Sequence, residues 1–251
     1  MSGRGALCIA LMASIASACT ELTDNATTAL SIQFEPLASP SVVVGDSLRD
    51  TTGALAPPIV HAFNFQGDEI LAPTVRFHAA DAGITVDDVT GIVRGDSLIS
   101  TPARVVASIG SLQALQRIDV TLRPDAITAV DGNDTLQYHL IDSTLNVSAQ
   151  LTVRVLHGLL ADSAVSSYVV SFAVVSGGAP ELASLVDGAG KPSIIDTTDA
   201  TGLAGRAVRV RPVHLGPVTE DSVIVNATVK YRGSPVSGSP VRLVVHLRPR
   251  T

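Results

Sequence analysis

The chain has 251 residues, which is enough for one large domain or for two domains of ordinary size. Hydrophobic residues make up 46% of the sequence but aromatic residues only 3%, so aliphatic side chains that suit pleated sheets would fill a core. The formal net charge of −6 at pH 7 argues against binding to nucleic acid or to an anionic membrane surface.

The N-terminus has the pattern of an export signal. The first residues carry a positive charge, an apolar stretch runs to Ala18, and Ala16-Ser17-Ala18 matches an A-x-A cleavage pattern directly before Cys19. The apolar stretch is shorter than the roughly 18 residues needed to span a bilayer. We therefore expect residues 1–18 to be a signal peptide and the mature chain to hold one cysteine, which leaves no internal disulfide.

The end of this segment resembles the lipobox of bacterial lipoproteins, in which a small residue precedes an acylated cysteine. The resemblance implies that Cys19 is the site of lipid attachment and that residues 19–29 are a lipidated N-terminus and tether. Thr20 follows the cysteine where an aspartate would imply the inner membrane, so the resemblance implies a cell-envelope protein anchored in the outer membrane. The alternative is ordinary secretion with Cys19 as a chance first residue.

Three short segments of the first half return in the same order in the second half. The pairs are Asp88–Ile92 with Asp199–Leu203, Val106–Ser108 with Asn226–Thr228, and Val120–Pro124 with Val245–Pro249. Repetition in one order indicates one fold used twice. We therefore predict two modules, residues 30–124 and residues 125–251, each near the roughly 100 residues of an immunoglobulin-type sandwich.

Apolar and polar residues alternate along many short segments, which predicts strands. In chain order the expected strands lie within 40–48, 59–65, 75–77, 84–86, 104–109, 118–122, 136–140, 151–155, 168–175, 208–211, 223–232 and 241–248. In the second of these, Ile59, Phe63 and Phe65 are expected to share one face with His61. Only 112–116 and 180–186 have the pattern of a turn or two of helix, well short of the roughly 11 residues of an average helix.

Five segments resemble those of the bacterial Ig-like domains found in invasin- and intimin-type surface proteins. They are Val44–Leu48, Val75–Phe77, Val86–Gly95, Asp187–Lys191 and Asp199–Ala207. The many short strands punctuated by turn residues independently predict an all-β fold of sandwiches. With the resemblance, the expected architecture is two tandem Ig-like β-sandwiches after a lipoprotein signal peptide.

The segment Val42–Leu48 resembles the first block of the GDSL hydrolases, in which the serine, here Ser47, is the nucleophile. That family also needs Gly-x-Asn-Asp for the oxyanion hole and Asp-x-x-His for the base. Gly132-Asn133-Asp134 is one residue short of the former, and no histidine has an aspartate three positions before it. Because Gly-Asp-Ser-Leu also recurs at 95–98, we predict a turn at Ser47 and no enzyme.

Arg94-Gly95-Asp96 is the tripeptide that integrins bind in adhesion proteins. A receptor contact requires an exposed loop, and a turn after Ile92-Val93 would supply one. The alternative is that the glycine and the aspartate only form the turn and that the arginine precedes them by chance. Arg94, Gly95 and Asp96 are therefore a possible binding loop.

Three groups of oxygen-bearing side chains are candidate Ca²⁺ ligands. They are Asp81 with Asp87 and Asp88, Asp131 with Asn133 and Asp134, and Asp196 with Asp199. Calcium takes about six to eight oxygen ligands, and no group alone supplies that many. Asp and Asn beside Gly usually form turns, and the six histidines lack zinc-binding spacing, so we predict no metal and no cofactor.

The function that these observations favour is that of a non-catalytic, lipid-anchored cell-envelope protein. It would act as a surface spacer or as an adhesive module, with the membrane as one partner through its N-terminal lipid and a protein or glycan of unknown identity as another. The alternatives are a GDSL-type esterase that uses Ser47 and a stalk stiffened by Ca²⁺.

Overall fold

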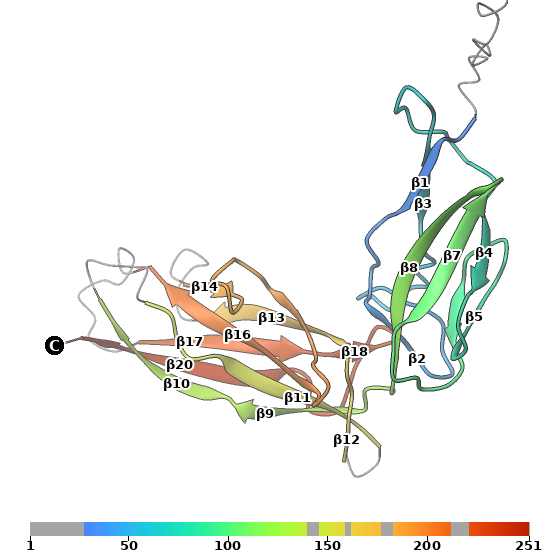
Figure 1. The fold of residues 1–251 in the computed structure, drawn as a ribbon. Coiled ribbons are helices and arrows are strands. Elements are labelled where there is room, and N and C mark those ends of the chain that lie inside the picture. The colour runs from blue at the N-terminus through green and yellow to red at the C-terminus, as the bar shows by residue number, and fades with distance from the viewer. Residues whose placement is uncertain (1–27, 140–145, 159–161, 177–182, 212–220, 251) are drawn as a thin grey trace, which may run out of the picture.

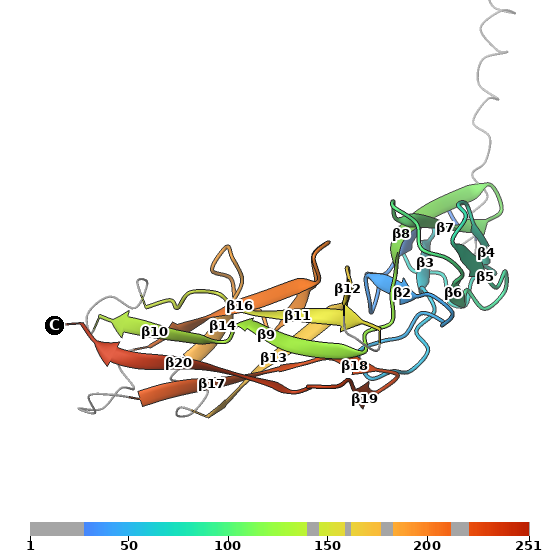
Figure 2. The ribbon, with the colours of Figure 1, turned by 90° about the horizontal axis from the view of Figure 1, so that it is seen from below.

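The computed structural model describes residues 28–139, 146–158, 162–176, 183–211 and 221–250, and the structural statements below concern these residues. Their regular structure consists of strands and turns, and no helix among them is long and apolar enough to cross a membrane. The strands form two lobes, an N-terminal lobe and a C-terminal lobe. The lobes meet at an angle, so the molecule is bent (Figure 1), and the view from below shows the same two lobes (Figure 2).

The N-terminal lobe contains eight of the strands. They are β1 (Ser31–Phe34), β2 (Ser41–Val43), β3 (Val60–Phe63), β4 (Arg76–Ala79), β5 (Ile84–Val86), β6 (Val93–Gly95), β7 (Ala103–Ile109) and β8 (Leu112–Thr121). A four-stranded sheet with the order β2-β8-β7-β4 is packed against two small sheets, β1-β3 and β5-β6, over a shared core. This lobe is thus built from sheets packed face to face.

The remaining strands belong to the C-terminal lobe. They are β9 (Ala126–Asp131), β10 (Asn133–Tyr138), β11 (Leu151–His157), β12 (Ser163–Ala164), β13 (Val169–Ser176), β14 (Ala183–Val186), β15 (Ile195–Thr197), β16 (Leu203–Val210), β17 (Asp221–Thr228), β18 (Lys230–Tyr231), β19 (Ser234–Pro235) and β20 (Val241–Pro249). One sheet has the order β10-β20-β17-β13-β15, and the facing sheet has the order β12-β11-β16-β14 with β9 paired to β11. The hairpin β18-β19 stands apart from both sheets.

The same strand order occurs in both lobes. In each, the first strand of the main sheet pairs in parallel with the last, β2 with β8 and β10 with β20. The last strand then pairs antiparallel with the preceding long strand, β7 or β17. On the next strand of each sheet, Phe77 lies opposite Ala107 and Phe172 lies opposite Ala227. The residues around Ala107 and Ala227 are one of the repeated pairs of the sequence, so they occupy equivalent places in the two lobes.

Each lobe has its own hydrophobic core, which the alternation of side chains along the strands builds. In β17, Val223, Val225 and Ala227 are fully buried, as their spacing by two predicts. The buried cluster of the N-terminal lobe lies within residues 42–120, and that of the C-terminal lobe within residues 127–247. Each fully buried aliphatic side chain contributes about 1.5–3 kcal/mol to folding. The predicted fold class, all-β with two tandem β-sandwiches, is confirmed.

The prediction of a turn of helix at 112–116 is wrong, because these residues form the first half of β8. Gly110 and Ser111 make a two-residue hairpin turn between Ile109 and Leu112, which pair across it, and Gly110 has a φ of 58°. Cross-strand pairing therefore overrides the local pattern. Of the second helical candidate, 183–186 form β14, and 180–182 lie outside the described residues.

The alternation over 59–65 is as predicted, and the face that His61 and Phe63 share is the more exposed one. The opposite side of β3 holds Ala62, which is fully buried, whereas Ile59 and Phe65 beyond its ends are 55% and 49% exposed. The turn after β3 adds to this arrangement, because the Asn64 side-chain oxygen accepts hydrogen bonds from the backbone N–H groups of Gln66 and Asp68. Asn64 is buried to do so, and the alternation places its neighbour Phe65 outward.

Candidate functional site

The Gly45-Asp46-Ser47-Leu48 segment forms a tight turn after β2 at the end of the N-terminal lobe that faces the C-terminal lobe. Gly45 has a φ of 77°, and the N–H of Asp46 donates to the Val43 carbonyl at 3.0 Å. Leu48 is 2% exposed and enters the core of the lobe, whereas Asp46, 5% exposed, is a buried carboxylate. The segment that resembles a hydrolase motif therefore forms a turn in which the carboxylate of Asp46 is buried.

Hydrogen-bond donors from both lobes surround the Asp46 carboxylate. The Nε atom of Arg49 lies 3.1 Å from Oδ2, and the backbone N–H of Ser47 donates to Oδ1 at 2.8 Å. Arg232 donates from the other lobe, since its Nε lies 2.8 Å from Oδ2. Burial alone would raise the pKa of Asp46, but the hydrogen bonds from Arg232, Arg49 and Ser47 outweigh it and hold the pKa far below its usual range. Asp46 is thus ionised and links the two lobes.

Arg232 reaches Asp46 from the tip of the β18-β19 hairpin. Arg232 and Gly233 form its two-residue turn, with φ of 50° and 80°, so both residues are left-handed. A left-handed conformation is unfavourable for a residue with a side chain, and here the ion pair with Asp46 offsets it. The Arg232 guanidinium also lies over the Tyr231 ring, 5.4 Å from its centroid.

The backbones of the two lobes touch at a pair of glycines. A Cβ atom on Gly53, in the loop after the Asp46 turn, would overlap the Gly233 nitrogen and the Arg232 carbonyl carbon. A Cβ atom on Gly233 would lie 2.7 Å from the Thr52 carbonyl oxygen. Only glycine permits this approach from both sides. We call the contact region of Asp46, Gly53, Arg232 and Gly233, with the hydrogen bonds described next, the inter-lobe joint.

Two further hydrogen bonds cross the joint beside the linker that follows β8. The Ser41 hydroxyl donates to the Ser167 carbonyl at 2.6 Å, and the Thr121 hydroxyl donates to the Ser166 carbonyl at 2.6 Å. Thr121 is 1% exposed, although it lies on the opposite side of β8 from Ile118 and Val120, which are in the core of the lobe. The side chain of Thr121 is buried because the C-terminal lobe covers that end of β8 and accepts its hydrogen bond.

A cleft of about 380 Å³ opens between the lobes beside the joint. The N-terminal lobe contributes Ser39, Ser41, Val43, Asp46, Ser47 and residues 49–53, and the C-terminal lobe contributes Tyr168, Val169, Ser171, Ile194, Ile195, Thr228 and residues 230–233. The Tyr168 hydroxyl donates to the Lys230 carbonyl at 2.7 Å. Burial raises the pKa of Tyr168, and burial together with the charge of Asp46 raises the pKa of Tyr231, so both phenols stay protonated.

Ser47 lines this cleft without the partners of a catalytic serine. Nucleophilic attack requires a base within hydrogen-bond reach of the hydroxyl. No histidine lines the cleft, and the neighbouring Asp46 carboxylate is occupied by two arginines and the Ser47 N–H. Within the described residues, the arrangement supplies binding groups and no activated nucleophile.

The possible binding loop Arg94-Gly95-Asp96 lies partly in β6, where a free turn was expected. Gly95 is buried, and its N–H donates to the Asp46 carbonyl at 3.0 Å, so the two motifs singled out in the sequence pack on each other. The side chains of Arg94 and Asp96 on either side of it are exposed. Cys19 and the rest of the predicted signal and lipid site lie outside the described residues.

Six of the eight candidate Ca²⁺ ligands are engaged within the protein. The carboxylate of Asp199 accepts N–H groups of Thr201 and Leu203, that of Asp87 accepts N–H groups of Val89 and Thr90, and that of Asp134 accepts the Ala149 N–H. Asp81, Asp88 and Asp196 pair with Arg104, Arg76 and Arg206 respectively. In the described part of the chain, no three His, Cys, Asp or Glu side chains gather in a way that would hold a metal ion.

One turn type, which begins with Asp or Asn, recurs among the described residues. Its first residue accepts the N–H groups two and four positions on, and its fourth residue is a glycine with positive φ. The examples are Asp50–Gly53, Asn64–Gly67, Asp187–Gly190 and Asp199–Gly202. The Asp-x-x-Gly spacing is visible in the sequence. In the repeated pair at 88–92, however, the carboxylate that holds the turn belongs to Asp87, one position earlier.

Sequence reasoning did not identify Arg232, Arg49, Gly53 or Gly233 as site residues. Arg232 was expected only as the last residue of the strand within 223–232. Local spacing contains no signal that Arg232 meets Asp46, because the two residues are 186 positions apart. The combination of Arg, Gly and Ser at 232–234 does signal a turn, but not what the turn touches.

Comparisons with known proteins give the following. No protein-family model matches the chain, and no curated protein matches it. Among solved structures, the surface layer protein SbsC, domains 1–6, is 12% identical with a TM-score of 0.31, over 88% of this chain and 28% of that chain. Protocadherin Gamma B2, extracellular cadherin domains 3–6, is 14% identical with a TM-score of 0.31, over 88% and 51% respectively. Mouse cadherin-23 EC22–24 is 10% identical with a TM-score of 0.31, over 88% and 64%. This chain therefore spans about a quarter of the SbsC structure.

Proposed function

We propose that this protein is a non-catalytic, lipid-anchored envelope protein that holds a binding surface at a set distance and angle from the outer membrane. In this proposal residues 1–18 are removed, Cys19 carries the lipid, residues 19–29 are the tether, and residues 30–124 and 125–251 are two Ig-like modules of the bacterial, invasin-like kind. The observation that carries it is the Asp46 carboxylate, which Arg49 of its own lobe and Arg232 of the other lobe bind together.

A spacer differs from a flexible tandem array in the stiffness of its joint. Interfaces between domains of one chain usually permit relative motion. If the lobes moved apart, the buried Asp46 carboxylate would lose Arg232, one of its two cationic partners. The backbones that touch at Gly53 and Gly233 would also separate. Arg49 would remain beside Asp46, so the ion pair with Arg232 contributes only modestly by itself. The glycine contact and the hydrogen bonds of Ser41 and Thr121 to the other lobe add to it, and together they favour a single angle of the bend. The second lobe would therefore project from the tether in a fixed direction.

Spin labels on the two lobes test the stiffness. The sequence has only Cys8 and Cys19, so Val89→Cys and Val175→Cys would be the only thiols in a chain that also carries Cys8→Ser and Cys19→Ser. Both positions are exposed, at 62% and 53%, and lie in different lobes. We expect a narrow distance distribution between the labels, which Arg232→Gln broadens. A broad distribution in the parent protein would contradict the rigid spacer.

Membrane fractionation tests the anchor separately. With Cys19 intact we expect the protein in the membrane fraction, because several acyl chains hold a protein firmly. Cys19→Ser should move it to the soluble fraction, and an unchanged distribution would contradict lipid attachment. A negative result in the fractionation would leave the distance measurement unaffected, and the reverse is also true, because the joint does not involve Cys19.

Adhesion through Arg94 and Asp96 is a second candidate function. Its support is that both side chains are exposed at the end of β6 while Gly95 between them is buried. Asp96→Glu keeps the charge and lengthens the side chain, so it should abolish binding to a purified integrin while leaving folding unchanged. If the parent protein and the variant bind equally, or neither binds, this candidate is rejected.

A further inference from the structure

We propose that the cleft at the inter-lobe joint binds an acidic saccharide, a sugar ring that carries one carboxylate. The inference rests on the fixed joint of the proposed function and is independent of the lipid anchor. Four features of the cleft support it: the volume, an uncompensated positive charge, an exposed apolar wall and a set of hydroxyl groups.

The cleft has the size and position of a small-molecule site. Its volume is about 380 Å³, and small-molecule sites commonly measure about 300–1,000 Å³ and lie at domain interfaces. Residues of both lobes line it, and the Asp46–Arg232 pair at the joint holds the walls in place. A ligand would therefore enter a largely preformed site, which lowers the entropic cost of binding.

The charges around the cleft leave one cation without a counter-charge. Arg49 and Arg232 bind Asp46, and the Asp50 carboxylate accepts hydrogen bonds from Thr52 and Ala54 in its own turn. Lys230 also lines the cleft, and no carboxylate among the described residues lies within ion-pair distance of it. The cleft therefore carries a surplus positive charge, which favours a ligand with a single negative group.

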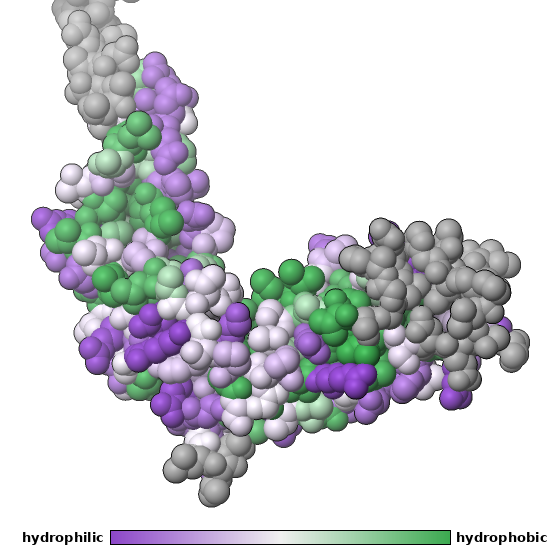
Figure 3. All heavy atoms as spheres, turned by 180° about the vertical axis from the view of Figure 1, so that it is seen from behind, coloured by the Kyte–Doolittle hydropathy of each residue, from purple (hydrophilic) through white to green (hydrophobic). Residues whose placement is uncertain are grey.

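One wall of the cleft is apolar and open to solvent. Ile194 and Ile195, at the start of β15, are 63% and 45% exposed, and Val169 of the neighbouring strand β13 also lines the cleft. Figure 3 shows apolar surface on the C-terminal lobe next to the N-terminal lobe. Covering such surface gains about 25 cal/mol per Å². The C–H face of a sugar ring is flat enough and apolar enough to do so.

The remaining lining groups suit a polyhydroxylated ligand. Hydroxyl side chains of Ser39, Ser47, Ser171 and Thr228 line the cleft, and each both donates and accepts. The hydroxyls of Ser39 and Ser171 already donate to the carbonyls of Ser41 and Thr228 and keep their capacity to accept. A fatty acid chain would leave that capacity unused, and a multiply phosphorylated ligand would exceed the single surplus charge. A ring with hydroxyl groups, one apolar face and one carboxylate uses all three properties.

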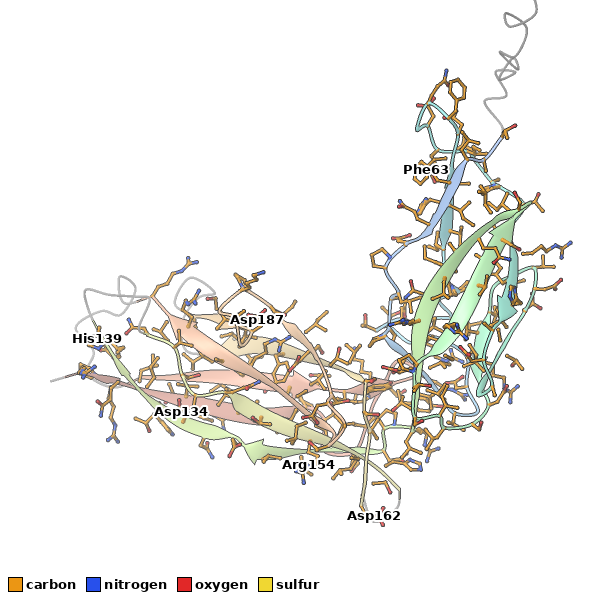
Figure 4. The ribbon with its side chains drawn as sticks, in the orientation of Figure 1. Phe63, Asp134, His139, Arg154, Asp162 and Asp187 are labelled. Carbon is orange, nitrogen blue, oxygen red and sulfur yellow. The ribbon has the colours of Figure 1, made fainter. Side chains whose placement is uncertain are left out.

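Lysine methylation gives a direct test, because Lys191 and Lys230 are the two lysines of the sequence. Reductive methylation with ¹³C-formaldehyde places one NMR probe in the cleft and one outside it. Lys191 is the matched control, since its N–H closes the Asp187 turn, and Figure 4 shows Asp187 on the C-terminal lobe away from the joint. D-glucuronate is the probe ligand, and D-glucose and acetate are the controls. The protein used is the full chain with Cys19→Ser.

We expect D-glucuronate to shift the Lys230 signal in a saturable manner and to leave Lys191 unchanged. D-glucose and acetate should bind at least about tenfold more weakly, because D-glucose lacks the carboxylate and acetate lacks the sugar ring. Lys230→Gln, followed through the methyl signals of Ile194 and Ile195, should lose about tenfold in affinity, and Lys191→Gln should lose none.

Two results would overturn the inference. The first is the absence of a saturable shift up to about 20 mM D-glucuronate. The second is equal binding of acetate, which would mean that Lys230 attracts any small anion. Either result would leave the distance distribution between lobes and the membrane fractionation unaffected, so it is distinguishable from failure of the proposed function.

Discussion

The Nε atom of Arg232 lies 2.8 Å from Oδ2 of Asp46, although 186 positions of sequence separate the two residues. Arg232 sits at a hairpin tip of one lobe and Asp46 in a turn of the other. Because Asp46 is buried and Arg232 is half exposed, the pair forms at the edge of the joint, where the charge of the carboxylate is poorly solvated. This geometry makes the joint testable by single substitutions.

Arg232→Gln should loosen the joint with a modest loss of stability. The side chain of Arg232 is 52% exposed, so water screens the pair, and Arg49 still neutralises Asp46 after the substitution. We expect a loss of about 1 kcal/mol in the free energy of unfolding by urea, together with a broader distance distribution between the lobes. Arg242→Gln, on the exposed side of β20, is the control and should leave both unchanged.

Asp46→Asn should destabilise the protein more strongly and in a pH-dependent way. Removing the buried carboxylate leaves two arginines facing a neutral amide, at a cost of about 2–3 kcal/mol at pH 7 after allowance for their partial exposure. The folded-state pKa of Asp46 lies below its unfolded value, so its contribution is fully present above the unfolded pKa of about 3.9 and is lost as the pH falls towards the folded-state pKa.

Urea unfolding of the parent protein and Asp46→Asn at several pH values measures this dependence. The difference between them should be constant from about pH 5 to pH 8 and should narrow below about pH 4. A difference that grows on acidification would mean that Asp46 is not held ionised by the two arginines.

Gly53→Ala should lower the free energy of unfolding by more than the positive φ of Gly53 alone explains. Gly53 has a φ of 93°, and an added Cβ atom would also overlap the backbone of Arg232 and Gly233. Gly110→Ala is the matched control, because Gly110 also has a positive φ, 58°, but nothing lies within 4 Å of an added Cβ atom. The control should lose about 1–2 kcal/mol, and Gly53→Ala should lose more and should separate the lobes. Equal losses with an unchanged inter-lobe distance would argue against the glycine contact.

Phe77→Ala and Phe172→Ala test whether the two predicted modules are separate folding units. The two phenylalanines occupy equivalent places and are buried in different cores, so each substitution should cost about 3–5 kcal/mol in its own lobe. Amide hydrogen exchange should accelerate in β2, β4, β7 and β8 for Phe77→Ala and in β10, β13, β17 and β20 for Phe172→Ala. Acceleration throughout the chain in both variants would indicate one cooperative unit.

The purified protein should not hydrolyse short-chain esters through Ser47, since no base lies beside that hydroxyl in the described residues. Release of p-nitrophenol from p-nitrophenyl acetate, compared between the parent protein and Ser47→Ala, measures this. Equal rates are expected. A rate well above background that Ser47→Ala abolishes would restore the esterase as the function.

Much of the fold could be predicted from local sequence, because the signal for a strand is carried by residues two positions apart. The run Val223, Val225, Ala227 and Val229 predicted its own buried face, and all four are fully buried. The Gly-Ser pair at 110–111 is also compatible with the β7-β8 hairpin, but Leu112 and Leu115 at helical spacing equally suit a turn of helix, and only cross-strand pairing decides between the two. The alternation over 59–65 was visible as well, but not which of its two faces is buried, because that depends on the buried turn that Asn64 forms.

The sequence by itself determined the β class, the repeated order of strands and the turns, since each depends on backbone preferences and side-chain alternation within about ten residues. Only the tertiary structure decided that the hydrolase-like turn meets an arginine of the other lobe, that two distant glycines touch, and that a cleft lies between the two lobes. Those features depend on how two separately packed cores are placed against each other, and that placement arises from contacts between residues far apart in the chain.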